Sequence, residues 1–228
     1  MYIYVKRFFD IFFSLICILI FLPIFIIVSL ILKFSGEGEV FYLQKRLGFK
    51  IKKFSIIKFA TMLKNSENIG SGTITLRNDF RVTKPGKILR KTKINELPQI
   101  FNIFIGDISF VGPRPLVKKT FDDYPITIKN LIYNSKPGLT GIGSIFFRDE
   151  ELILSTTRNE SPQNFYKRVV APFKGDLELW YLHNKSFVLD FKLIVLTAYI
   201  VIFPKSKIIL NSFHNLPQIP GELKEFFK

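Results

Sequence analysis

Residues 91–115 read KTKINELPQIFNIFIGDISFVGPRP, and this stretch decides the fold around it. Pro98 suits the first turn of a helix, and Leu97, which precedes a proline, is expected to be extended. The apolar face of the predicted helix consists of Ile100, Phe101, Ile103 and Phe104. Gly106 is expected to end the helix.

Polar residues flank this helix on both sides. Asn95 and Glu96 come just before its N-terminus, where free backbone N–H groups and the helix dipole favour an anion such as phosphate. Arg114 lies between Pro113 and Pro115, and a guanidinium held this stiffly suits bidentate contact with phosphate oxygens. The pattern is typical of a phosphate site, or of a structural turn with an incidental surface ion pair, and these residues leave both open.

The composition narrows the class of protein. The chain has 228 residues and a net charge of +15, with 33 Lys and Arg against 18 Asp and Glu, which indicates an anionic partner. It is also 48% hydrophobic with 26 Phe and has no recognised nucleic-acid motif, which disfavours a nucleic-acid binder. One cysteine excludes a disulfide framework, and two histidines disfavour a His-rich metal centre.

An apolar run over residues 8–32 follows a Lys-Arg pair near the N-terminus. Residues 11–32 are long enough to cross a bilayer as a helix. A signal peptide is disfavoured because residues 33–36 offer no small-x-small cleavage site. Pro23 should kink the helix, and basic residues flank both ends. A single kinked span and a re-entrant helix with both ends on one side therefore both remain open.

The rest of the chain reads as short elements and loops. Strands are predicted at 40–43 and 54–59 and a basic helix at 86–91. Segments 65–78 and 149–161 are expected to loop out, 136–141 to turn, and 204–228 to form a loosely structured tail. Residues 193–203 are apolar but too short to span a membrane, so they predict either a core helix or an interfacial one.

Taken in order, these pieces resemble the bacterial sugar transferases that act as small monotopic phosphoglycosyl transferases. The matching segments are Lys6-Arg7 with Asp10, the proline-containing apolar helix, and residues 38–48, 58–62, 78–83, 91–115, 137–141 and 176–197. The resemblance implies a small membrane-associated α/β fold. It would have a proline-kinked re-entrant helix (1–35), a cytoplasmic-face transferase domain with interfacial helices (36–203) and a C-terminal tail (204–228). The family's Ser-Pro pair reads Leu22-Pro23 here.

The resemblance also implies an activity. Such proteins transfer a sugar-1-phosphate from a nucleotide diphosphate sugar, here expected to be a UDP-sugar, to undecaprenyl phosphate with Mg²⁺. This step initiates surface glycan or polysaccharide assembly at the cytoplasmic face of the bacterial inner membrane. The nucleotide sugar, the lipid phosphate and anionic inner-membrane lipids would account for the positive charge. No nucleic-acid partner is expected, and a homodimer is left open.

By the same resemblance, Glu96 and Asn95 stand at the catalytic pair, with Glu96 also associated with the metal. The implied phosphate-binding residues are Arg90, Lys91, Arg114 and Arg148. Alternatively, Arg90 and Lys91 belong to a solvated basic face, and Arg148 is a surface arginine without a binding role.

One departure bears on activity, because the family has an aspartate nucleophile where this chain has Asn95. A carboxamide is neutral and weakly nucleophilic, so Asn95 cannot attack phosphorus as a carboxylate does. Four hypotheses follow. The change disables or traps the enzyme; Glu96 becomes the nucleophile; the lipid phosphate attacks directly, held by Arg114 and Mg²⁺; or the chain is a membrane-bound binding or scaffold protein.

Overall fold

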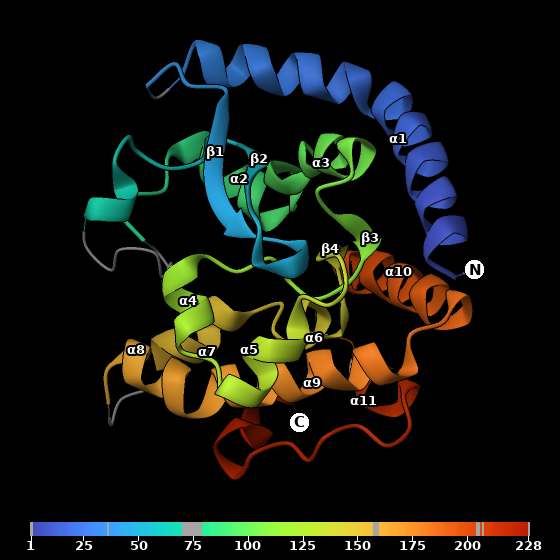
Figure 1. The fold of residues 1–228 in the computed structure, drawn as a ribbon. Coiled ribbons are helices and arrows are strands. Elements are labelled where there is room, and N and C mark those ends of the chain that lie inside the picture. The colour runs from blue at the N-terminus through green and yellow to red at the C-terminus, as the bar shows by residue number, and fades with distance from the viewer. Residues whose placement is uncertain are drawn as a thin grey trace.

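The computed structural model describes residues 2–35, 37–69, 79–156, 160–203, 206 and 208–227. Figure 1 shows one long helix, α1, curving over a body of shorter helices and two small sheets. This mixture of helices and small sheets, with a long apolar N-terminal helix compatible with membrane association, agrees with the coarse form of the α/β prediction. The division at residues 35 and 203 stays a prediction.

The elements follow one another closely along the chain. The α-helices are α1 (Tyr2–Lys33), α2 (Lys84–Lys91), α3 (Gln99–Ile105), α4 (Lys118–Asp122), α5 (Ile126–Ile132), α6 (Ile142–Phe146), α7 (Glu150–Thr156), α8 (Pro162–Phe165), α9 (Ala171–Asn184), α10 (Phe187–Ile202) and α11 (Ile208–Ser212). The 3₁₀ helices are η1 (Phe49–Ile51), η2 (Ser66–Asn68), η3 (Ile94–Glu96) and η5 (Gly221–Phe227), and η4 (Tyr166–Val170) is a π-helical turn. The strands are β1 (Phe41–Leu47), β2 (Lys53–Phe59), β3 (Ser109–Val111) and β4 (Gly138–Thr140).

The two sheets differ in how their strands pair. β1 and β2 form an antiparallel hairpin that pairs Tyr42 with Lys58, and the two predicted strands are confirmed. β3 and β4 pair in parallel across a long connection, so the prediction of a turn over 136–141 was wrong. Gly112 N–H donates to Thr140 O at 3.0 Å, and this distant pairing draws residues 138–140 into an extended strand.

The helix predicted after Pro98 is confirmed as α3, and Gly106 ends it with a φ of +105°. The prediction that Leu97 is extended was wrong, because its φ is −53° and its ψ −38°. Leu97 N–H donates to Ile94 O at 3.1 Å, which continues η3 into α3. Its side chain packs on the apolar cluster beneath α1, and this burial outweighs the local bias imposed by the proline.

Two predicted loops and the predicted tail also contain structure. Within 149–161, α7 is helical, and residues 157–159 lie outside the described residues. Within 65–78, η2 is present, and residues 70–78 lie outside the described residues. The tail is not loose where it is described, because Leu223 is fully buried and residues 221–227 pack on the main core. Buried apolar side chains thus order a tail that the sequence predicts to be loosely structured.

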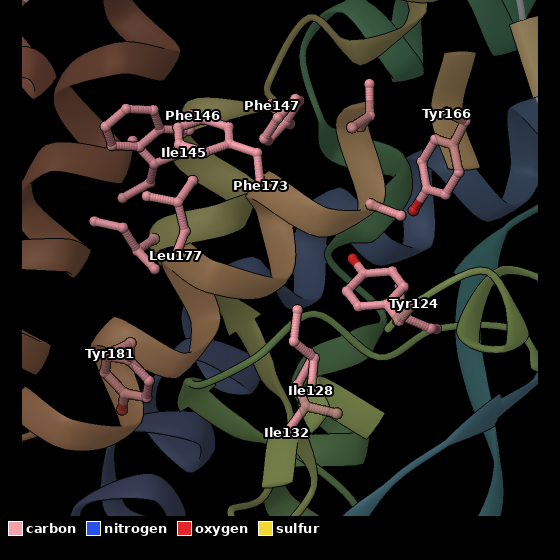
Figure 2. Packing of buried hydrophobic residues seen from close by; sticks show 14 of the residues in the cluster. Tyr124, Ile128, Ile132, Ile145, Phe146, Phe147, Tyr166, Phe173, Leu177 and Tyr181 are labelled. Carbon is pink, nitrogen blue, oxygen red and sulfur yellow. The ribbon is translucent and has the colours of Figure 1, made fainter. Parts of the chain in front are cut away.

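The main hydrophobic core surrounds α9. Figure 2 shows Phe173 and Leu177 of α9 beside Ile145 and Phe146 of α6. Phe227 of the C-terminal segment joins these rings, with its centroid 5.6 Å from that of Phe146. The core thus fixes α9, whose Glu178 contacts the backbone of a site residue described below.

The first half of α1 is held by polar contacts. Asp190 of α10 accepts hydrogen bonds from Tyr2 and from Tyr181 of α9, both at 2.7 Å, and forms an ion pair with Lys6. These four residues are named the anchor cluster. Farther along α1, Asp10 Oδ1 accepts from the backbone N–H of Phe110 at 3.1 Å. Carbonyls at the end of α3 receive further hydrogen bonds from Arg7.

The second half of α1 is held by apolar packing. Phe25, Val28 and Leu32 lie in a second core with Phe59 of β2 and Leu89 of α2. Among the described residues, α1 alone is long and apolar enough to cross a membrane, and only 17% of its most apolar window is buried. Such exposure is unlike a core helix of a soluble protein.

α10 combines the two alternatives that its sequence left open. Leu193, Leu196 and Ile200 are buried against the core, whereas Phe191 and Ile202 are more than two thirds exposed. One face is therefore a core face and the other is an apolar face without a partner in the described chain.

Candidate active site

The site is built around Glu96, at the end of η3. Its Oε1 lies 3.8 Å from Lys58 Nζ of β2 and 3.9 Å from Arg114 Nη2, which follows β3. These separations are ion-pair distances but longer than hydrogen bonds. Arg46 of β1 lines the same small cavity as Lys58 and Arg114. Arg46, Lys58, Glu96 and Arg114 are named the Glu96 site.

The charges of the Glu96 site are unbalanced. Burial acts to raise the pKa of Glu96, but the positive charges of Lys58 and Arg114 outweigh it and lower that pKa to about 2. Burial lowers the pKa of Lys58 to about 7, and burial with the neighbouring Arg114 lowers the pKa of Arg46 to about 10. Three cationic side chains face one carboxylate, which is the electrostatic character of an anion site.

The turn that carries Arg114 is fixed by its backbone. Tyr133 Oη donates to Arg114 O at 3.0 Å and accepts from Leu116 N–H at 2.8 Å. Arg46 Nη1 donates to Pro115 O at 3.0 Å, and Gly138 N–H donates to Pro113 O at 2.9 Å. The guanidinium of Arg114 is therefore presented from a rigid segment, as the two prolines predict.

Asn95 lies beside this site with an unused acceptor. The residue is 7% exposed, and no hydrogen-bond donor in the described part of the chain reaches its Oδ1. A buried polar atom without a partner is uncommon in native proteins. Asn95 thus places an unpaired amide oxygen next to Glu96 in the sequence.

The structure brings together Asn95, Glu96 and Arg114, and no ion pair or hydrogen bond among the described residues joins the other predicted residues to them. Arg90 forms an ion pair with Glu151 of α7, although its charge also acts on Lys58. Lys91 is exposed at the end of α2. The Arg148 guanidinium donates to Ile200 O at the end of α10. The binding roles assigned to these residues stay predictions.

Sequence reasoning missed Lys58 and Arg46 as members of the site. Lys58 is a cationic residue inside a predominantly apolar strand segment, and a charge in such a segment is rarely buried without a partner. Arg46 lies beyond the predicted strand at 40–43, next to Lys45 in a basic stretch, and gave no such signal. Pairing in the hairpin, which positions the strand residues relative to one another, could not be read from the two segments separately.

The donor set fits a magnesium ion only in part. No group of three or more His, Cys, Asp or Glu side chains is positioned for a metal among the described residues. Glu96 supplies one carboxylate and Asn95 one orphaned amide oxygen. Mg²⁺ is commonly held by one or two carboxylates together with substrate phosphates and water, so this pair suits an ion that arrives with a diphosphate.

A family model described as bacterial sugar transferase matches residues 1–204. The chain belongs to the bacterial sugar transferase family. The family is one of phosphoglycosyl transferases and is membrane-associated, and relatives act on undecaprenyl phosphate with a UDP-sugar.

Three relatives illustrate the range of family lengths. The exopolysaccharide production protein ExoY of Rhizobium meliloti is 35% identical over 159 residues, covering 64% of this chain and 70% of the relative. The undecaprenyl-phosphate glucose phosphotransferase of Komagataeibacter xylinus is 32% identical over 211 residues, covering 88% and 36%. The UDP-glucose:undecaprenyl-phosphate glucose-1-phosphate transferase of Klebsiella pneumoniae is 33% identical over 199 residues, covering 85% and 39%. This chain spans little more than a third of the two longer relatives.

Proposed function

We propose that this protein transfers a sugar-1-phosphate from a UDP-sugar to undecaprenyl phosphate and so initiates exopolysaccharide or surface glycan assembly. The observation that carries the proposal is the surplus of positive charge around Glu96 in a member of this family. In the reaction, the phosphoanhydride bond of the UDP-sugar breaks and UMP leaves. A new phosphoanhydride bond joins the sugar phosphate to the lipid phosphate.

Each residue of the Glu96 site has a task in this proposal. Arg114 and Lys58 bind the two phosphates of the nucleotide sugar, because both have charge that Glu96 balances only at ion-pair distance. Arg46 adds positive charge from the floor of the cavity. Glu96 and Asn95 would contribute oxygen ligands to Mg²⁺, which neutralises diphosphate charge when bound.

Glu96 is the group of this site that can accept the sugar phosphate covalently, since its low pKa keeps it ionised at neutral pH. Its Oε would attack the phosphorus next to the sugar and release UMP. The lipid phosphate would then attack the same phosphorus and free the carboxylate. In the direct route, the lipid phosphate displaces UMP in one step and Glu96 only orients the substrates.

The way α1 is held supports a re-entrant arrangement at the cytoplasmic face of the inner membrane. Lys6 is paired in the anchor cluster, and Phe25 and Leu32 pack on the second core, so both halves of α1 contact the same body. A helix crossing the membrane perpendicularly would carry one half away from that body. Pro23 lies between the two contacts and would bend the helix back. The +15 charge suits an anionic leaflet.

Asn95 favours a second candidate function, that of a membrane-bound protein that binds a UDP-sugar without turning it over. By the family resemblance an aspartate nucleophile stands at this position, and the carboxamide that replaces it here is neutral and buried.

One experiment separates these functions. UMP release is measured from a panel of UDP-sugars with Mg²⁺, with and without undecaprenyl phosphate, for the chain and for Asn95→Asp and Glu96→Gln. The proposal expects turnover by the chain that Glu96→Gln abolishes. Release of one UMP per protein molecule in the absence of lipid identifies the covalent route. No release of UMP without lipid identifies the direct route. If the chain releases no UMP but Asn95→Asp does, the protein is a disabled transferase. If none of the three proteins releases UMP but the chain binds a UDP-sugar, it is a binding protein.

A further inference from the structure

The turn that carries Arg114 is also held by a carboxylate on α9. Arg114 N–H donates to Glu178 Oε1 at 3.2 Å. Glu178 lies on α9 and is only 1% exposed. Because the core packs on the other faces of α9, this contact ties the rigid interior to the backbone of one site residue.

The surroundings of Glu178 are shaped to admit its carboxylate. A Cβ at Gly143 would lie 2.4 Å from Glu178 Oε1, and a Cβ at Gly141 would lie 2.2 Å from Gly112 O. Both distances are shorter than side-chain atoms tolerate, so glycine at each position lets α6 approach the carboxylate and the Arg114 turn.

The Glu178 carboxylate has fewer hydrogen-bond partners than a buried carboxylate usually has. Lys174, one helical turn earlier on α9, directs its ammonium to Glu150 at 2.6 Å. No donor in the described ranges reaches Glu178 Oε2, which is buried. Burial of an unpaired carboxylate oxygen costs free energy, so stability alone does not explain a glutamate at position 178. The hydrogen bond that Oε1 accepts from Arg114 N–H does explain it.

We propose that Glu178 is a positioning residue for sugar-phosphate transfer: by accepting the Arg114 N–H it holds the Arg114 guanidinium in place beside Glu96. The inference rests on the proposed function, because it assigns Glu178 a part in that same site. Glu178 acts through Arg114 and does not touch the substrate.

The decisive test is a double-mutant cycle on UMP release. Glu178→Leu removes the acceptor and is expected to lower kcat/KM on the order of 100-fold, as a misplaced binding group does. Arg114→Ala keeps the backbone N–H but removes the guanidinium. In that background Glu178→Leu should cause little further loss, because nothing remains to be positioned. Glu178→Gln, which keeps an acceptor oxygen, should restore most of the activity.

Two further variants keep the test valid if Glu178→Leu folds poorly. Gly143→Ala leaves every polar group in place but displaces the carboxylate, so it should lower kcat/KM as Glu178→Leu does. Tyr2→Phe is the control, since it removes a partly buried hydrogen bond to Asp190 without touching residues 110–117. It should leave kcat/KM unchanged.

Hydrogen exchange of the peptide covering residues 110–117 reports the contact without any turnover. Faster exchange in Glu178→Leu, with wild-type exchange in Tyr2→Phe, supports the inference. Unchanged exchange, or a loss of activity as large in the Arg114→Ala background as in wild type, would overturn it. If the wild-type chain is silent with every UDP-sugar, the transfer function fails. Exchange then decides whether Glu178 holds the Arg114 turn.

Discussion

The anchor cluster and the Glu96 site both enclose a lysine and a carboxylate, yet they pair these groups differently. In the anchor cluster, Asp190 receives two tyrosine hydroxyls at 2.7 Å and a close lysine, so both carboxylate oxygens are used. In the Glu96 site, the carboxylate meets Lys58 and Arg114 only at 3.8 and 3.9 Å.

This difference separates a structural cluster from a binding site. A buried network in which every donor and acceptor is matched rigidifies the fold and has nothing left to offer a ligand. A cluster with surplus positive charge, next to the unmatched oxygen of Asn95, stays incomplete until something enters. Both clusters contain ionised pairs, so completeness of pairing distinguishes them.

The largest expected effect is on stability, in the anchor cluster. Asp190→Ala leaves Lys6 with no carboxylate in a site where both side chains are at most 15% exposed. We expect a loss of about 3–5 kcal/mol in the free energy of unfolding, because an uncompensated charge remains buried. Denaturation of the protein in lipid nanodiscs measures this.

The matched control is Asp122→Ala, which breaks an exposed Lys118 pair within α4. It should cost less than about 0.5 kcal/mol. Equal losses in the two variants would mean that the anchor cluster is not a structural network.

A smaller effect concerns Glu178, whose pairing lies between the two extremes. Burial raises its pKa from 4.5 to about 7, so the folded protein binds this proton more tightly than the unfolded chain. The resulting stabilisation is fully present below pH 4.5 and is lost as the pH rises through 7.

Between pH 4.5 and 7.5 the wild type should therefore lose about 3 kcal/mol of stability relative to Glu178→Gln, which cannot titrate. Unfolding curves of both proteins across this range measure the difference. Parallel curves would show that Glu178 titrates as an exposed glutamate does.

The smallest effect concerns the charge of Lys58. Burial lowers its pKa to about 7, so its positive charge is lost as the pH rises through that value. Affinity for a UDP-sugar should then weaken by up to about tenfold per pH unit above 7. Lys58→Arg stays charged and should flatten the dependence, as calorimetry at pH 6.5, 7.5 and 8.5 would reveal. The same slope in both proteins would remove Lys58 from the site.

The parts of the fold that the sequence predicted are those fixed by local chemistry. Pro98 and Gly106 delimit α3 because each restricts its own backbone. β4 was not predicted, because its partner β3 lies far away in sequence and two of the six residues at 136–141 are glycines. Leu97 likewise adopts helical angles for the sake of distant packing. Non-local contacts decide these cases, and no local pattern carries them.

The candidate site divides in the same way. Asn95, Glu96 and Arg114 stand out in sequence because a proline adjoins or closely follows each of them. Lys58 and Arg46 join them only through the hairpin, and Glu178 only through the packing of α9. Arg148 looked like a free cation, yet its guanidinium caps the end of α10. A side chain's partner, unlike its charge, is a property of the folded chain.

The anchor cluster also sets an order of assembly. Lys6 and Asp190 are 184 residues apart in the chain. Synthesis proceeds from the N-terminus, so α1 is made before α10 and waits for it before the polar groups of the anchor cluster are matched. Until then α1 presents the unpaired Lys6, the hydroxyl of Tyr2 and a long apolar surface to the ribosome exit and the membrane. This helix is thus translated long before its polar contacts can form.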